Sequence, residues 1–244
     1  MEYVIMSILA VILGQICKQL CLKFPPVVAE EITYPQFLSG IKKDFKVDLK
    51  YSLIFLIIHN FILFSTQNLL MSVIYSLVIF SLAIVFSVDY RFELIPDECS
   101  LFIGYIALIK ILLTGSSIVD ALLGALLGGG IFYLLGKLAV MIFKKEGMGF
   151  GDVKLMAVLG LLFGIKTTFV LTFLAFFIGA IISCICLVVK KKGFDSYIPF
   201  GPFIVIAAIL LMFIEPQYFI DLYIDMCSSL SYFITDILFN IAGK

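Results

Sequence analysis

The sequence predicts an all-α polytopic membrane protein with about eight transmembrane helices. Three observations lead to this fold class: 63% of the 244 residues are hydrophobic, only 14% are charged, and the apolar residues gather in long runs. The mean hydropathy of +1.19 is far above what a water-soluble domain can bury in one core. Because a hydrocarbon layer about 30 Å thick needs about 20 apolar residues per helix, such runs are typical of membrane spans.

Eight apolar runs are candidate helices. Some are short for a full crossing, so local thinning of the bilayer or residues recruited from the loops would make up the length. The first run opens with the acidic Glu2 and lacks a small-residue cleavage pattern, so we expect it to be retained. The predicted helices cover residues 3–22, 51–64, 69–88, 101–113, 121–143, 153–163, 167–189 and 200–214.

Basic residues predict the orientation of the helices. Lys and Arg gather in four loops, which the positive-inside rule places in the cytoplasm: residues 42–50, Arg91, residues 144–145 and residues 190–192. The intervening loops and the amino terminus are expected outside. Residues 23–50 are expected to form a cytoplasmic loop, and residues 217–241 an interfacial amphipathic helix or a ninth span.

Several functional classes have no support in the composition. The formal net charge is zero and no basic stripe interleaved with aromatic residues occurs, so we expect no nucleic-acid binding. The six cysteines lie mostly inside apolar runs, and they do not form the two CxxC pairs of a zinc ribbon. We therefore expect neither a structural metal nor a disulfide framework.

Two aspartates, Asp89 and Asp152, stand at the ends of apolar runs on the side predicted to be cytoplasmic. Two spans separate them, so the chain crosses the membrane and returns, and their carboxyl groups can meet. Two carboxyl groups about 3 Å apart cannot both ionise and therefore share one proton. One can then act as a base on water while the other polarises a carbonyl, as in aspartic proteolysis. Either Asp alone could instead be a loop residue or a helix N-cap.

Residues around the two aspartates are candidates for supporting roles. Gly149 and Gly151 lack Cβ atoms, which is expected to allow unusual φ and ψ angles and the close approach of a peptide. Lys154 is expected to tune the charge of Asp152, to contact a substrate carbonyl, or to be an interfacial anchor. Asp97, after Pro96, is most simply a helix N-cap. Glu146, Pro199 and Gly201 complete the candidate set.

His59, the only histidine, lies inside an apolar run. A polar residue within the membrane is a functional candidate by default. Because the sequence offers no partner for a functional role, we expect His59 to form a hydrogen bond between helices.

Three segments resemble one family. Residues 146–155 (EGMGFGDVKL) are similar to the GxGD box of prepilin peptidases, the type IV leader peptidase family of membrane aspartyl proteases. Asp89 with Ile95-Pro96-Asp97 resembles the first aspartate box of this family, and residues 198–203 (IPFGPF) resemble its third segment. The resemblance implies one integral-membrane peptidase domain over residues 1–244, with Asp89 and Asp152 as catalytic residues.

The same resemblance implies a substrate. Prepilins or pseudopilins would be cut at the cytoplasmic face of the inner membrane, between a short basic leader and a hydrophobic helix, and no cofactor would be needed. Bacterial members commonly also methylate the new amino terminus with S-adenosylmethionine. Larger members often carry paired CxxC motifs in the first cytoplasmic loop, and this sequence lacks them.

Two other functions also fit part of the pattern. A transporter or channel could use Asp89 and Asp152 as a proton or cation relay, but it would hold them near the bilayer midplane, in related halves of the chain. A protease of the presenilin type also carries a GxGD motif and cleaves inside a helix. The Ile-Pro-Asp and Pro-Phe-Gly-Pro segments favour the prepilin type.

Overall fold

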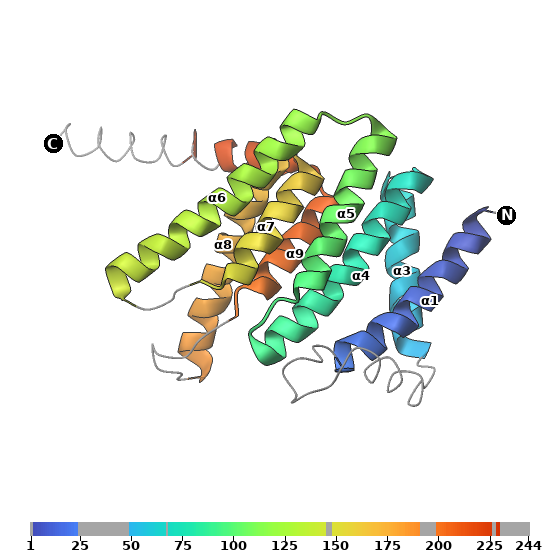
Figure 1. The fold of residues 1–244 in the computed structure, drawn as a ribbon, viewed down its shortest axis with the longest axis horizontal. Coiled ribbons are helices and arrows are strands. Elements are labelled where there is room, and N and C mark those ends of the chain that lie inside the picture. The colour runs from blue at the N-terminus through green and yellow to red at the C-terminus, as the bar shows by residue number, and fades with distance from the viewer. Residues whose placement is uncertain are drawn as a thin grey trace. The chain divides into compact units, whose positions relative to one another are not determined.

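The computed structural model describes residues 2–23, 49–66, 68–144, 148–190, 199–225 and 228–229. Within them, each of the eight apolar runs forms a helix, and no strand occurs in these ranges. The helices are α1 (Glu2–Lys23), α3 (Leu49–Thr66), α4 (Leu69–Phe92), α5 (Asp97–Thr114), α6 (Ile118–Phe143), α7 (Phe150–Phe163), α8 (Ile165–Lys190) and α9 (Gly201–Phe213), as Figure 1 shows.

The chain divides into two compact units, residues 1–213 and residues 214–244. The first unit contains all the labelled helices. In the second unit, Pro216–Asp225 is helical. This helix covers the start of the segment predicted as interfacial helix or ninth span, and most of the rest of that segment lies outside the described residues. The predicted loop at residues 23–50 also lies almost wholly outside them.

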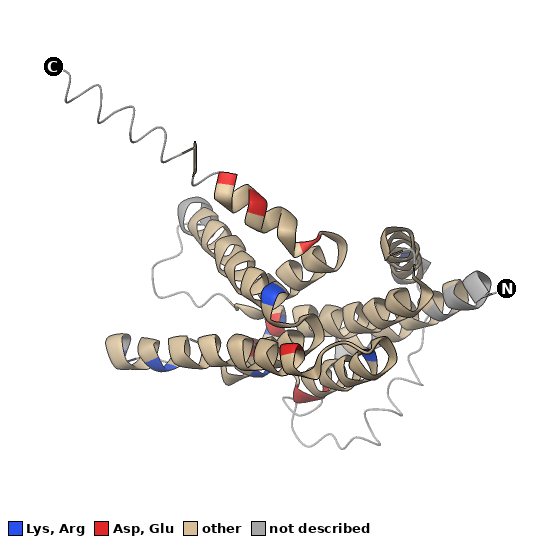
Figure 2. Ribbon diagram, turned by 90° about the horizontal axis from the view of Figure 1, so that it is seen from above, with Lys and Arg blue, Asp and Glu red and all other residues tan. Residues whose placement is uncertain are grey.

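Three helices, α4, α6 and α8, are long and apolar enough to cross a membrane. The count rises to four if α9 and Pro216–Asp225 are taken as one broken span. About eight spans were predicted, so length and composition support a smaller number among the described residues. Charged residues are sparse along the ribbon (Figure 2).

Within the first unit, connections of a few residues join α4 to α5, α5 to α6 and α7 to α8. In Figure 1, α4, α6 and α8 end, and α5, α7 and α9 begin, towards the same end of the unit. We call this end the site end. The predicted basic positions Arg91 and Lys144 are the penultimate residue of α4 and the C-cap of α6, so both belong to it.

Glycines allow α6 and α7 to form the most extensive contact between any two helices. A Cβ atom on Gly124 would clash with the carbonyl oxygen of Gly160, and one on Gly128 would lie 2.6 Å from the carbonyl oxygen of Met156. The two backbones therefore touch directly, as small residues allow in membrane helices.

Polar groups hold the opposite end of α7. The Lys110 ammonium on α5 donates a hydrogen bond to the carbonyl of Leu162 at 2.7 Å. The carboxylate of Asp120 on α6 accepts one from the backbone N–H of Ile165 at 3.3 Å. Gly164 lies between these two bonds with φ +80°, and a Cβ atom there would overlap Asp120. These bonds satisfy backbone groups that the ends of α7 and α8 leave without helical partners.

A buried hydrogen bond links α3 to α4. Nδ1 of His59 and the hydroxyl of Ser76 are 2.8 Å apart, and both side chains are buried. The predicted hydrogen bond from His59 to another helix is confirmed. A similar bond joins Gln15 on α1 to Ser52 on α3.

Candidate active site

Asp89 lies in the last turn of α4, because the helix continues beyond the predicted end at Val88 to Phe92. Only 5% of its surface is exposed. The Asp89 carboxyl faces the backbone N–H of Gly201 at the start of α9. A Cβ atom at position 201 would overlap a carboxyl oxygen of Asp89, so only glycine fits there without displacement.

Asp152 lies in the first turn of α7. It is also 5% exposed, and its carboxyl faces the backbone N–H of Gly149. Gly149 is the N-cap of α7, so the structure excludes the alternative that Asp152 itself caps the helix. Burial, followed by the negative charge of the nearby Asp89, raises the pKa of the Asp152 carboxyl to about 7. This end of the bundle therefore brings the two carboxyl groups within electrostatic range of each other.

Ile95 connects the three segments of the site. It lies in the connection between α4 and α5 and is buried. A Cβ atom on Gly151 would lie 3.0 Å from the Cβ atom of Ile95, and one on Gly201 would lie 3.3 Å from its Cδ1 atom. The glycines of α7 and α9 thus pack closely against one apolar side chain. Its position directly before Pro96 was the available sequence signal, but Ile95 was not among the predicted site residues.

The backbone prediction for Gly149 and Gly151 is wrong in one respect. Gly149 has φ −70° and ψ 143°, which any residue can adopt, and Gly151 is helical. Close approach, rather than an unusual dihedral angle, is what requires glycine at position 151. Among the described residues other than glycine, positive φ angles occur at Glu93 and Lys144, the C-caps of α4 and α6.

Asp97 is not a helix N-cap. Pro96 occupies that position, without a side-chain hydrogen bond, and Asp97 is the first residue of α5. Both carboxylate oxygens of Asp97 accept hydrogen bonds of 2.8 Å from the Lys154 ammonium, and this ammonium also lies 5.2 Å from the centre of the Phe150 ring. Lys154 therefore joins the start of α7 to the start of α5. Asp97 was not predicted as the partner of Lys154.

Removing the ion pair is expected to destabilise the protein only slightly. The two side chains are 40% and 59% exposed, so the pair contributes no more than about 1 kcal/mol to the free energy of unfolding. Lys154→Met and Asp97→Asn should each lower this free energy, measured by thermal unfolding in detergent, by up to this amount, and the exchange Asp97→Lys with Lys154→Asp should restore most of it. The exposed Lys166→Met is the control; equal losses in all these variants would contradict a specific role.

The remaining predicted site residues are Glu146 and Pro199. Glu146 lies outside the described residues. Pro199 is partly exposed and stands two residues before Gly201. Within the described part of the chain, no three His, Cys, Asp or Glu side chains form a cluster that could hold a metal ion. The cysteines of that part are free thiols: Cys17, Cys21, Cys99, Cys184 and Cys186.

The fold and site define a helical, strongly apolar protein with two buried carboxyl groups, at the end of α4 and the start of α7, that lie within electrostatic range of each other. Comparison with known proteins adds a family: the type IV leader peptidase family matches residues 75–184. The leader peptidase HopD of Salmonella typhimurium is 35% identical over 129 residues, which are 50% of this chain and 80% of that protein. The chain therefore belongs to the type IV leader peptidase family.

Other relatives are longer than the matched region. The prepilin leader peptidase/N-methyltransferase of Xanthomonas campestris is 33% identical over 129 residues, or 52% of this chain and 44% of that protein. The protein of the same name from Stutzerimonas stutzeri is 33% identical over 121 residues, or 49% and 42%. The chain thus spans less than half the length of these two relatives. No solved structure is significantly similar.

Proposed function

We propose that this chain is a membrane aspartyl endopeptidase that removes the leader from type IV prepilins or pseudopilins, with Asp89 and Asp152 as its catalytic pair. The observation that carries the proposal is that these two buried carboxyl groups lie in terminal helical turns packed around Ile95, within electrostatic range of each other, and that each faces a backbone N–H. Burying two carboxyl groups together is costly, and such groups concentrate at functional sites. Family membership supplies the class of substrate.

The pair can hydrolyse a peptide bond with one shared proton. One carboxylate takes a proton from water as the water oxygen attacks the scissile carbonyl carbon, and the protonated partner donates a hydrogen bond to the carbonyl oxygen. The tetrahedral intermediate then collapses: the C–N bond breaks, and the amine leaves with a proton from the pair. One water molecule is consumed, and the pair returns to its singly protonated state.

The proposed location is the inner membrane, with the site facing the cytoplasm. Three apolar helices of membrane-spanning length support the location. The basic residues Arg91 and Lys144 at the site end support the orientation, because basic loops are retained in the cytoplasm. Asp89 and Asp152 lie in terminal helical turns rather than in mid-helix, which favours a peptidase that cuts near the membrane surface over a relay across the bilayer.

Methylation is a second candidate activity, because the names of two relatives include N-methyltransferase. S-adenosylmethionine would be the methyl donor. The described residues contain no independent feature that we can assign to this cofactor, so the mechanism above concerns proteolysis alone.

The direct test is to incubate the purified chain, in lipid nanodiscs, with prepilins and pseudopilins from the same genome. We expect one cut that removes the leader, mapped by mass spectrometry of the product. Absence of cleavage for every such substrate would overturn the proposal. The same spectra test methylation, because a product heavier by one methyl group in the presence of S-adenosylmethionine would establish it, and an unmodified product would restrict the enzyme to proteolysis.

A further inference from the structure

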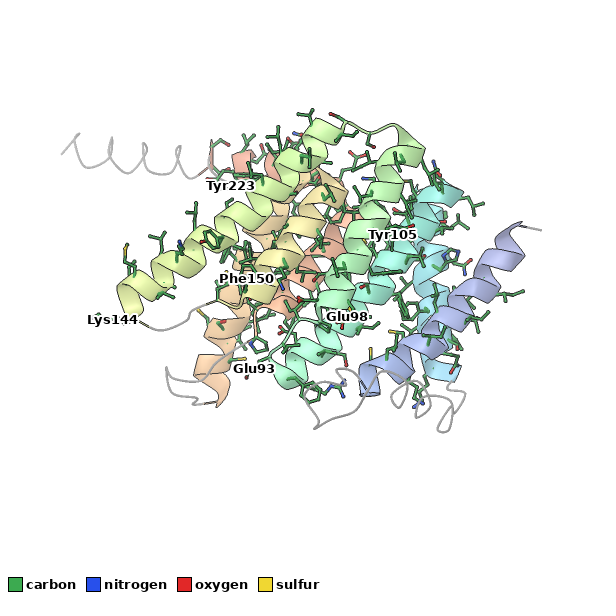
Figure 3. The ribbon with its side chains drawn as sticks, in the orientation of Figure 1. Glu93, Glu98, Tyr105, Lys144, Phe150 and Tyr223 are labelled. Atoms are coloured by element: carbon green, nitrogen blue, oxygen red, sulfur yellow. The ribbon has the colours of Figure 1, made fainter. Side chains whose placement is uncertain are left out.

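The connection between α4 and α5 carries Ile95 and is fixed at both of its ends. Glu93, its first residue, caps α4 with φ 55° and donates a backbone hydrogen bond of 2.8 Å to the carbonyl of Asp89. Pro96, its last residue, is the N-cap of α5, and a proline favours extended backbone in the residue before it. Figure 3 shows Glu93 at the end of α4 and Phe150 at the start of α7. The connection therefore holds Ile95 in place at the site end.

The terminal methyl group of Ile95, Cδ1, lies between two glycines that each adjoin a carboxyl group of the proposed catalytic pair. Cδ1 would be 3.7 Å from a Cβ atom on Gly151 and 3.3 Å from one on Gly201. Gly151 directly precedes Asp152 in α7, and the backbone N–H of Gly201 at the start of α9 faces the Asp89 carboxyl. One methyl group thus separates the backbone that carries Asp152 from the backbone that contacts Asp89.

Packing, rather than a hydrogen bond, holds one oxygen of Asp89. Its Oδ2 atom is buried, and no hydrogen-bond partner for it occurs within the described part of the chain. A Cβ atom on Gly201 would overlap this same oxygen. Because Gly201 in turn contacts Ile95, a change at position 95 reaches the Asp89 carboxyl through a single intervening residue.

We propose that the side chain of Ile95 sets the spacing of the two carboxyl groups and is a positioning residue of the peptidase. The inference rests on the proposed function and deepens it, because it names a residue outside the helices of both aspartates that controls how the pair shares its proton. Two carboxyl groups share one proton only while they are close together, so the protonation of the pair depends on their spacing. Without Cδ1, the glycines on either side lose the group that they pack against, and the pair is held less closely.

Other charges around the pair stay the same when only Ile95 is changed. Lys154 and Asp97 neutralise each other at 2.8 Å, and α9 contributes no charged residue. Among the described residues, those with charged side chains within about two turns of the site end of α4 to α8, apart from the pair, are Arg91, Glu93, Asp97, Glu98, Lys137, Lys144, Lys154 and Lys190. A change in the protonation of Asp152 in a variant at position 95 therefore reports the spacing of the pair.

Ile95→Val removes Cδ1 alone and should slow the chemical step. We expect kcat for a prepilin that the wild-type protein cleaves to fall about tenfold, with KM within about twofold, because a small misplacement of reacting groups is costly. Burial and the charge of Asp89 both raise the pKa of Asp152, and both weaken when the pair is held less closely. The alkaline limb of kcat/KM should therefore move to lower pH, by about half a pH unit. Ile95→Ala should enlarge both effects.

Ile111→Val is the matched control. Ile111 is 7% exposed and Ile95 is 8% exposed, but Ile111 lies about 21 Å along α5 from Asp97 at 1.5 Å per residue. Both variants lose the same methyl group from a buried place, so both should unfold at a slightly lower temperature in detergent. Only Ile95→Val should change kcat and the pH profile. An unchanged or upward-shifted alkaline limb in folded Ile95→Val, or equal shifts in both variants, would overturn the proposal.

Infrared titration tests the spacing without a substrate. The C=O stretching band of a protonated carboxyl disappears as the group ionises, and the band of Asp152 is the one that Asp152→Asn removes. In Ile95→Val this band should disappear at lower pH than in the wild-type protein, and in Ile111→Val at the same pH; an unchanged band in Ile95→Val would contradict the role of Ile95. A wild-type protein that cleaves no prepilin would overturn the proposed function, whereas the titration would still decide whether Ile95 sets the spacing.

Discussion

Asp89→Asn and Asp152→Asn should each lower the rate of prepilin cleavage by a factor of about 10³ or more, because the two carboxyl groups act as one unit and neither can replace the other. Asparagine preserves the size of the side chain but can neither take up nor supply the shared proton. The measurement is a single-turnover cleavage assay with purified variants in nanodiscs. Thermal unfolding of each variant should remain cooperative, which separates a loss of chemistry from a loss of fold.

Glu98→Gln is the control for these variants, since Glu98 is an exposed carboxylate at the same end of the bundle. It should cleave at nearly the wild-type rate. Wild-type cleavage by either Asn variant would remove that aspartate from the mechanism, and equal losses in Glu98→Gln would point to a general effect of charge.

The pH dependence should follow the protonation of the pair. The pKa of Asp152 is raised to about 7, so this carboxyl holds its proton at acidic pH and loses it as the pH rises through neutrality. The active pair needs that proton, so kcat/KM should fall about tenfold per pH unit above about pH 7. In the wild-type protein, a flat profile up to pH 9 would contradict the shared-proton mechanism.

Gly124→Ala should cause the second large effect, on folding rather than on chemistry. A methyl group at position 124 would clash with the backbone carbonyl of Gly160 on α7, and backbone cannot move aside as a flexible side chain can. Overpacking typically costs about 1–3 kcal/mol, and we expect a loss of free energy of unfolding at the upper end of this range. Because α7 carries Asp152, cleavage should fall in the same variant.

Gly130→Ala offers a matched control on the same helix. A Cβ atom at position 130 has no neighbour within 4 Å, so the substitution should be neutral or should stabilise α6 by up to about 1 kcal/mol. Thermal unfolding in detergent measures both changes. Equal stability of the two variants would show that the contact between α6 and α7 is looser than the structure indicates.

Helices were predictable because long apolar runs dictate them, but their ends depend on contacts that a single sequence does not display. The fourth predicted helix began at Leu101, whereas α5 begins at Asp97, because the acidic and polar first turn contributes no apolar signal. Asp97 was assigned to capping on local chemistry, yet its partner Lys154 lies 57 residues away. Asp89 and Asp152 were predicted as a pair because both stand at the ends of apolar runs on one side of the membrane, in segments that resemble one family, and the structure places both in terminal helical turns.

Close contacts between helices were the least predictable part of the site. The sequence shows glycine at positions 151 and 201, but only the folded chain shows that Ile95 fills the space beside both. An apolar groove lined by the second half of α6 and the start of α7 also depends on folding, since the connection between these helices separates its two walls in the chain.

The short helix α7 is held at both ends by α5, through Lys154 to Asp97 and through Lys110 to the carbonyl of Leu162. Between these two attachments the chain has a fixed helical phase, because each added or removed residue would turn the later part of the helix by about 100°. After such a change in length, α7 could keep only one of its two attachments to α5. The number of residues in α7 is therefore as much a determinant of where Asp152 points as their identity, and variation in chain length is better tolerated outside this pair of helices.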